Sequence, residues 1–135
     1  MRRAGVEVLV SMLTAEEVME LDLTQEAAYC EQVGMIYRSY PIADREVPLS
    51  YAAFAAFLSE LGQELQAGRS VAVHCRASIG RASLLLASVL CAEGLSPTDA
   101  FTRITKARGL QVPDTPEQVR WVEGLAHYLK QSRRI

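Results

Sequence analysis

The sequence predicts an α/β fold, with a mainly parallel central sheet of about four strands and helices on both of its faces. Short apolar runs bounded by turn residues indicate buried strands, and longer runs with an apolar stripe indicate helices. The two kinds of segment alternate along the chain, and parallel strands need such crossover helices. A length of 135 residues suits one domain, so we expect residues 1–135 to form a single domain.

The first half of the chain carries clear local signals for strands and helices. In residues 6–12, valines alternate with other side chains, which predicts a strand. Thr14 and Glu17 have the spacing of a capping box, which marks the start of a helix. Ser50 is a suitable cap for a longer helix with one apolar stripe. The expected strands are 6–12 and 35–42, and the expected helices are 14–21, 24–34 and 50–68.

The second half begins with a short apolar run, Ser70 to Val73, that follows the breaker Gly68 and predicts a buried strand. The next segment, 82–92, is almost wholly apolar and predicts a buried helix. Ser96 precedes a proline and starts another helix, which ends at about residue 108. A last helix is expected from residue 115 onward.

One segment joins the strand 70–73 to the helix after it: His74-Cys75-Arg76-Ala77-Ser78-Ile79-Gly80-Arg81. The free N–H groups and the dipole of a helix N-terminus favour negative charge, and a nearby cation lowers the pKa of a thiol further. Cys75 is therefore the candidate nucleophile. Arg81 offers a planar fork of donors for two phosphate oxygens, and residues 76–81 are the candidate phosphate-binding loop. His74 is interpreted as a brace of the loop.

This constellation resembles the H-C-x5-R signature of the Cys-based protein tyrosine and dual-specificity phosphatases. The resemblance is to small bacterial and archaeal dual-specificity-like members and spans roughly residues 4–130. It implies a phosphoric monoester hydrolase that forms a phosphocysteine intermediate without a cofactor. No clustered metal-ligand spacing appears in the sequence, so no metal is expected.

Such a reaction needs a group that protonates the leaving oxygen, and Asp44 is the best candidate for this general acid. It follows the expected strand 35–42, and loops at the carboxyl ends of parallel strands gather at one edge. The segment Pro41 to Pro48 also resembles the general-acid loop of dual-specificity phosphatases. Glu46, two residues further on, is the fallback acid.

The segment Arg108 to Gln118 resembles the region that lines the pocket and positions water in tyrosine phosphatases. The resemblance gives Asp114 and Gln118 supporting roles. Gln118 also has the spacing of a capping-box residue with Thr115, and this structural reading is slightly favoured.

Two residues depart from the usual loop of the family. Ser78 stands where a glycine is common, and Ala82 stands where a serine or threonine follows the arginine. In the resembled family that hydroxyl hydrogen-bonds the thiolate and helps it leave from phosphocysteine. The resemblance therefore implies a slow enzyme. Ser83 points about 100° away around the helix and is a poor substitute.

Composition narrows the possible partners and compartment. The net charge of −2 argues against nucleic-acid binding, and no apolar run approaches a membrane span. An odd number of cysteines, three, does not form a disulfide framework, and no signal peptide precedes the first strand, so a cytoplasmic setting is expected. The N-terminus is short for the resembled family, which suggests a shortened chain or one that starts late.

The expected substrate is a phosphorylated protein or a small phosphomonoester. The chain is too short for pocket-deepening elements, so a shallow cleft that takes phosphotyrosine, and also phosphoserine or phosphothreonine, is the hypothesis. The alternatives are a weakly active phospho-binding module and a phosphatase of a phosphoinositide, a nucleotide or an RNA 5′-phosphate. A rhodanese-like sulfurtransferase or an arsenate reductase is less favoured, since Cys91 is badly placed as a resolving cysteine.

Overall fold

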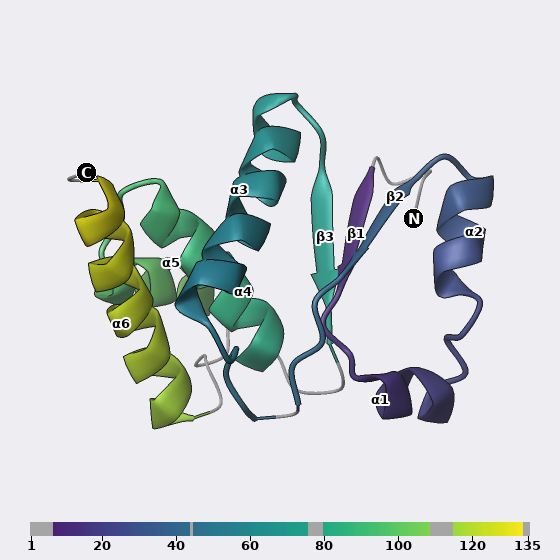
Figure 1. Cartoon of the computed structure of the whole chain (residues 1–135), viewed down its shortest axis with the longest axis horizontal. Helices are drawn as coiled ribbons and strands as arrows, with labels where there is room; N and C mark the ends of the chain where they lie inside the picture. Colours follow the sequence, from purple (N-terminus) through teal and green to yellow (C-terminus); the bar gives the residue numbers. More distant parts are fainter. Residues whose placement is uncertain (1–6, 44, 76–79, 109–114, 134–135) are drawn as a thin grey trace.

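The computed structural model describes residues 7–43, 45–75, 80–108 and 115–133 (Figure 1). Within these ranges the chain forms three strands and six helices. The strands are β1 (Val8–Ser11), β2 (Ile36–Ser39) and β3 (Val71–His74). The helices are α1 (Ala15–Glu20), α2 (Glu26–Gln32), α3 (Tyr51–Gln66), α4 (Gly80–Ala92), α5 (Pro97–Arg108) and α6 (Pro116–Arg133).

The sheet is parallel with the strand order β2-β1-β3. The central strand β1 is buried along its whole length, because strands cover both of its edges. The expected parallel α/β sheet is thus confirmed, but the expectation of about four strands is wrong for the described residues, which form three. Each of the three segments expected as a strand, 6–12, 35–42 and 70–73, contains one strand, and the other regular segments form helices.

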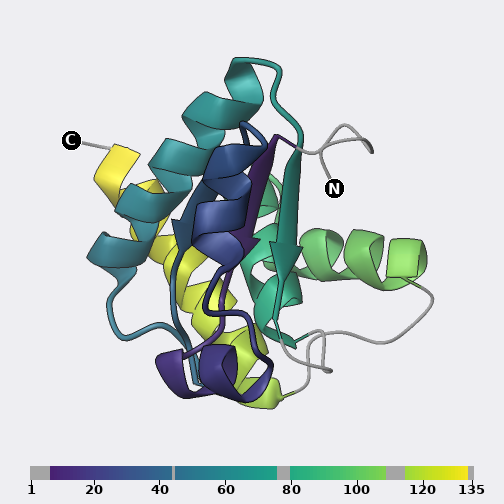
Figure 2. The ribbon, with the colours of Figure 1, turned by 90° about the vertical axis from the view of Figure 1, so that its right-hand side faces the viewer.

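The helices lie on both faces of the sheet, as expected. Helices α1 and α2 lie on one side, and α3, α4, α5 and α6 lie on the other (Figure 1). Turned by 90°, α2 stands in front of the sheet and α1 lies near the carboxyl ends of the strands (Figure 2). The main core fills the space between the sheet and the larger helical layer. Its fully buried members include Val8, Val10, Phe54, Leu84, Leu85 and Leu125.

The helix starts show which capping predictions were right. Thr14 caps α1 and exchanges both bonds of a capping box with Glu17, and the Ser50 side chain caps α3. The second helix begins later than the expected residue 24. Its N-cap is Gln25, and the backbone N–H of Glu26 donates to the Leu23 carbonyl at 3.0 Å, which places residue 24 inside a turn.

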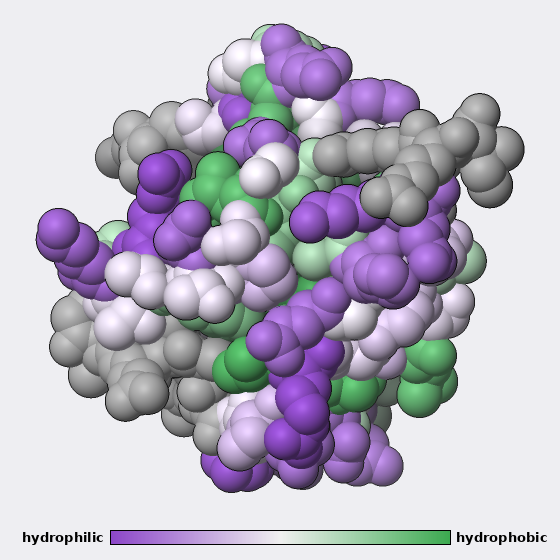
Figure 3. Space-filling view, turned by 90° about the vertical axis from the view of Figure 1, so that its left-hand side faces the viewer, coloured by the Kyte–Doolittle hydropathy of each residue, from purple (hydrophilic) through white to green (hydrophobic). Residues whose placement is uncertain are grey.

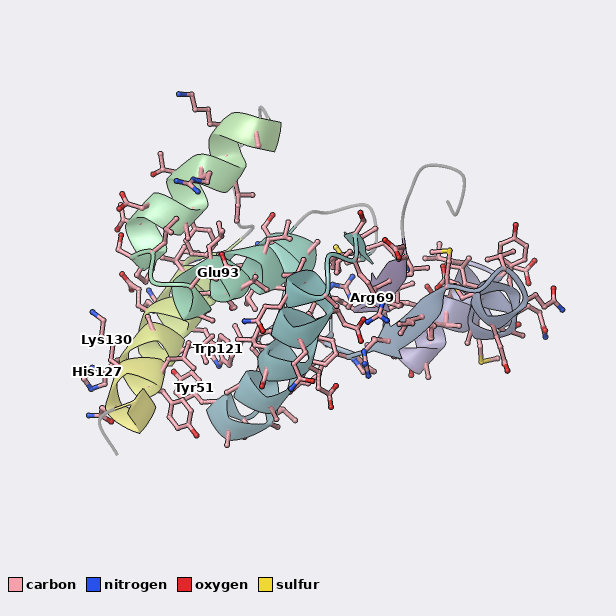
Figure 4. The ribbon with its side chains drawn as sticks, turned by 90° about the horizontal axis from the view of Figure 1, so that it is seen from above. Tyr51, Arg69, Glu93, Trp121, His127 and Lys130 are labelled. Carbon is pink, nitrogen blue, oxygen red and sulfur yellow. The ribbon has the colours of Figure 1, made fainter. Side chains whose placement is uncertain are left out.

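Helices α3 and α6 are joined by aromatic side chains. Tyr51 of α3 and Trp121 of α6 lie beside each other between the two helices (Figure 4), with ring centroids 4.9 Å apart. An added side chain at Gly124 would meet the Tyr51 hydroxyl, so the Tyr51 ring would have to shift from this close packing. The surface on the α6 side shows apolar areas between hydrophilic ones (Figure 3). None of the described helices is long and apolar enough to cross a membrane.

Backbone hydrogen bonds hold the carboxyl ends of the three strands together. The N–H of Met12, directly after β1, donates to the His74 carbonyl at 3.0 Å. The N–H of Ile42, in the loop after β2, donates to the Met12 carbonyl at 3.1 Å. The segments after β2 and β3, which carry the candidate acid and the candidate nucleophile, therefore leave the sheet at the same edge.

Candidate active site

Cys75 is the residue that directly follows β3, and it differs from the other two cysteines. It is half-buried at the edge of the main core, whereas Cys30 and Cys91 are buried. Burial raises the pKa of the Cys30 and Cys91 thiols, which keeps them protonated and unreactive. All three cysteines lie in the described part of the chain, and Cys75 is the one among them that is not buried. Its role as the nucleophile stays a prediction.

The loop after Cys75 leads into α4, whose first residue is Gly80. Residues 76–79, the candidate phosphate-binding residues Arg76, Ala77, Ser78 and Ile79, lie outside the described residues. The 13-residue helix α4 is long enough for its N-terminus to carry a useful dipole. Its first turn is buried, because the helix runs into the main core.

Arg81, in the first turn of α4, has a fully buried side chain. Its Nη1 and Nη2 atoms donate to the two carboxylate oxygens of Glu17 at 2.6 and 2.9 Å. Nη1 also donates to the Ile42 carbonyl at 2.7 Å. A bidentate pair of this kind fixes the plane of the guanidinium. The contacts show that Glu17 and the Ile42 carbonyl hold the orientation of the guanidinium. The role of Arg81 as a phosphate clamp, which the sequence predicted, stays a prediction.

Glu17 is a site residue that the sequence analysis did not identify. Its position in a capping box explained it completely, and the same carboxylate still accepts from the Thr14 N–H at 3.1 Å. The Arg81 hydrogen bonds, against the opposing effect of burial, lower its pKa from 4.5 to about 2. Glu17 is therefore ionised at neutral pH and acts as the counterion of the buried arginine.

We expect Glu17→Gln to lower the free energy of unfolding by about 3 kcal/mol at pH 7. This is the free energy that corresponds to lowering the pKa of the Glu17 carboxyl from 4.5 to about 2. A lowered carboxyl pKa stabilises the fold above pH 4.5, and this contribution is lost as the pH falls toward 2. Urea unfolding of both proteins should therefore show a difference that shrinks over this range. Glu16→Gln, on the exposed side of α1, is the control. An equal difference at pH 7 and pH 2.5 would contradict the pairing.

The acid loop is tied to Arg81 by the Ile42 carbonyl, which lies two residues before Asp44. The N–H of Glu46 donates to the Ala43 carbonyl at 3.0 Å, so the chain turns across this position. Arg45 has a positive φ of 65°, a strained value for a residue with a side chain. Asp44 itself lies outside the described residues, and its role as the general acid stays a prediction.

Gln118 forms the capping box that its spacing indicated. The Thr115 N–H donates to Gln118 Oε1 and the Gln118 N–H donates to Thr115 Oγ1, each at 3.2 Å. Gln118 is fully buried, and its Nε2 also donates to the Glu46 carbonyl at 3.3 Å. It therefore connects α6 to the acid loop. Its water-positioning role stays a prediction, and Asp114 lies outside the described residues.

His74 ends β3, and its Nε2 lies 3.0 Å from Glu26 Oε1 of α2. Both side chains are mostly buried, with exposed fractions of 28% and 17%. A carboxylate on one ring nitrogen fixes the orientation of the imidazole. The contact ties the end of β3 to α2, and the role of His74 as a brace of the loop stays a prediction. Glu26 is a second residue that the sequence analysis missed.

Ala82 and Ser83 follow Arg81 and are both buried. Among the described residues, the Ser83 hydroxyl has no hydrogen-bond partner. This is consistent with the expectation that Ser83 does not replace the hydroxyl missing at Ala82.

Comparisons with known proteins point to a family of phosphatases. A family model described as "Polymorphic toxin system, DSP-PTPase phosphatase" matches residues 1–95. A protein of Invertebrate iridescent virus 6, named as tyrosine phosphatase 197R, is 28% identical over 134 residues. That alignment covers 94% of this chain and 47% of the viral protein, so the chain spans about half the length of this curated relative.

Solved structures show the same fold. Kinase-associated phosphatase, in a form whose catalytic cysteine is replaced by serine, has a TM-score of 0.87 at 23% identity. The match covers 96% of this chain and 73% of that one. PTPMT1 in complex with PI(5)P has a TM-score of 0.82 at 19% identity, covering 95% and 81%. Human DUSP28 has a TM-score of 0.73 at 18% identity, covering 97% and 84%.

The family match spans well over half of the chain and includes both β3 and the Cys75–Arg81 segment. It confirms the resemblance to the Cys-based tyrosine and dual-specificity phosphatases. The chain belongs to the DSP-PTPase phosphatase family of polymorphic toxin systems.

Proposed function

We propose that this chain hydrolyses phosphotyrosine monoesters through a phosphocysteine at Cys75, and that a shallow cleft also admits phosphoserine and phosphothreonine. One observation carries the proposal. The hydrogen bond from Arg81 to the Ile42 carbonyl brings the start of α4 next to the loop that contains Asp44. Nucleophile, clamp and acid thus come from segments that meet at one edge of the sheet.

The proposed reaction has two steps. The phosphate is held by the N–H groups of the loop 76–81 and by Arg81, at the N-terminus of α4. The Cys75 thiolate attacks phosphorus, so a P–S bond forms while the P–O bond breaks, and Asp44 gives its proton to the leaving oxygen. A water molecule then attacks phosphorus and passes its proton to the Asp44 carboxylate. The P–S bond breaks, which releases phosphate and restores the thiolate.

A hollow of about 520 Å³ is lined by residues of the acid loop, and it favours a substrate that carries an apolar group. Its walls include Tyr40, Val47 and Pro48, and the side chain of Leu49 at its rim is fully exposed. The phenyl ring of phosphotyrosine, or an apolar side chain next to it, matches such a surface. The proposed thiolate chemistry needs a reducing compartment, and the cytoplasm is our proposed location.

The test is a substrate panel. Phosphate release should be measured from p-nitrophenyl phosphate and from one peptide that carries phosphotyrosine, phosphoserine or phosphothreonine in turn. We expect release from all four, fastest from p-nitrophenyl phosphate and the phosphotyrosine peptide. Binding of the peptides without any release would instead support a phospho-binding module. Strict use of phosphotyrosine would contradict the shallow cleft.

A second candidate is a phosphoinositide phosphatase. The fold neighbour PTPMT1 was solved in complex with PI(5)P, and Arg76 adds a cation to the phosphate-binding loop of this chain. PI(5)P in mixed micelles is therefore a further arm of the panel. A kcat/KM for PI(5)P more than tenfold above that for the phosphotyrosine peptide would favour this candidate.

We expect Ala82→Ser to speed the breakdown of phosphocysteine by about tenfold or more. The new hydroxyl can donate to the departing thiolate, and a hydrogen bond to a charged group is worth about 1.5–3 kcal/mol. Rapid quench with radiolabelled substrate measures the lifetime of the phosphoenzyme. Ser83→Ala, one position further along the same buried turn, should leave it unchanged. An unaltered lifetime in Ala82→Ser would contradict the reason given for slow turnover.

A further inference from the structure

A separate cavity of about 380 Å³ lies beneath α2, on the side of the sheet away from the main core. Leu9 of β1, Cys30 of α2 and Met35 form its buried apolar floor. Leu23 and the largely exposed Tyr29 form part of its walls. Figure 2 shows α2 standing over this part of the sheet. We call this space the α2 cavity.

The polar groups that line the α2 cavity are Asp22, Gln25 and Glu26, so its charged groups are carboxylates. The surrounding segment from residue 15 to residue 32 contains no lysine or arginine and has six acidic residues: Glu16, Glu17, Glu20, Asp22, Glu26 and Glu31. Tyr29 adds an aromatic face at the rim, and aromatic faces attract cations. An occupant that matches these walls has an apolar body and a positive charge.

We propose that the α2 cavity is a binding site for a small apolar molecule that carries an ammonium group. The apolar body would lie on Leu9 and Met35, and the ammonium group would lie beside Glu26. Burial, and to a smaller extent the charge of Glu26, raises the pKa of the Cys30 thiol in the cavity floor. Such a site lies outside the proposed catalytic machinery.

The same carboxylate links the α2 cavity to the candidate nucleophile. Glu26 Oε1 holds His74 Nε2 at 3.0 Å, and His74 directly precedes Cys75. A ligand ammonium competes with the imidazole for this carboxylate, and the brace on Cys75 is loosened when the ligand binds. Only this coupling rests on the proposed function; binding itself does not. By thermodynamic linkage, the contact between His74 and Glu26 weakens binding of the ammonium ligand by the same factor by which the ligand weakens that contact.

Binding is tested by NMR of the full chain with labelled methionine methyl groups, titrated with 4-phenylbutylamine. Met35→Leu assigns the reporting signal. We expect a saturable shift at Met35, and an affinity at least tenfold higher than for the anion 5-phenylpentanoate. Glu26→Gln, which keeps the shape of the side chain, should weaken amine binding at least fivefold. Glu31→Gln, exposed on the same helix, should not. No saturable shift, or equal affinity for amine and carboxylate, would overturn the site.

Coupling is tested by the rate at which iodoacetamide alkylates Cys75, followed by mass spectrometry of the Cys75 peptide. Loosening the brace lets Cys75 move away from the loop N–H groups that would stabilise its thiolate, the form that reacts with iodoacetamide. Saturating 4-phenylbutylamine should therefore lower this rate at least threefold, and should have no effect in Glu26→Gln. An unchanged rate in the parent chain at saturation would refute the coupling. Alkylation needs no phosphatase turnover, so failure of the proposed function appears separately, in the substrate panel.

Discussion

Turnover of p-nitrophenyl phosphate is expected to fall by a factor on the order of 10⁴ or more when Cys75 is replaced by serine. A serine hydroxyl keeps nearly the same shape but is not ionised near neutral pH, so it is a much weaker nucleophile than a thiolate. Cys75 is the half-buried cysteine that directly follows β3, and the proposed mechanism uses its thiolate as the nucleophile. Steady-state release of p-nitrophenol at saturating substrate measures the loss.

Cys91→Ser is the matched control for this loss. Its thiol is buried in α4 and burial raises its pKa, so the structure gives it no role in the reaction. The control should keep turnover within about threefold of the parent chain. More than one-hundredth of the parent activity in Cys75→Ser, or an equal loss in both variants, would show that the phosphate does not pass through Cys75.

Replacement of Asp44 by alanine is expected to have an effect that depends on the leaving group. For an alkyl phosphate, the loss should be on the order of 10²–10⁴, because the alkoxide must be protonated as it leaves. For p-nitrophenyl phosphate, whose leaving anion is stable without a proton, the first step should slow by less than about tenfold. Single-turnover rates on both substrates separate this step from the hydrolysis of phosphocysteine.

Glu46→Gln is the control for the acid, since Glu46 is the other carboxylate of this loop. Its backbone carbonyl, not its side chain, accepts the hydrogen bond from Gln118, so the substitution leaves that anchor in place. Equal losses on both substrates in Asp44→Ala would remove the general-acid role from Asp44. A leaving-group dependence found in Glu46→Gln instead would transfer that role to Glu46.

The predictable parts of this structure are those set by neighbours in sequence. The capping residues Thr14, Ser50 and Thr115 were read correctly because each accepts from an N–H only three residues away. The apolar run 70–73 predicted a strand correctly, because a short apolar run bounded by a turn residue is itself a local signal, and β3 covers Val71–His74. The start of α2 was placed too early, because Thr24 resembles a cap but lies in a turn.

The missed residues take part in contacts between distant segments. Glu17 and Arg81 are 64 positions apart, and Glu26 and His74 are 48 apart. Arg81 and His74 were noticed for their chemistry. Glu17 was already explained by its capping box, and Glu26 carried no local signal. Local patterns contain no information on which carboxylate will face a buried arginine, so these pairs could be found only in three dimensions.

The sequence by itself determined the order of the strands and helices along the chain, the family, and the candidate nucleophile, clamp and acid, because these depend on residue type and short spacing. The tertiary structure alone decided which groups surround them. It placed Glu17 against Arg81, Glu26 against His74, and the Ile42 carbonyl against the start of α4. The physical reason is that packing α1 near the carboxyl ends of the strands and α2 over one face of the sheet brings charged side chains from distant segments together, and a buried charge is stable only beside its counterion.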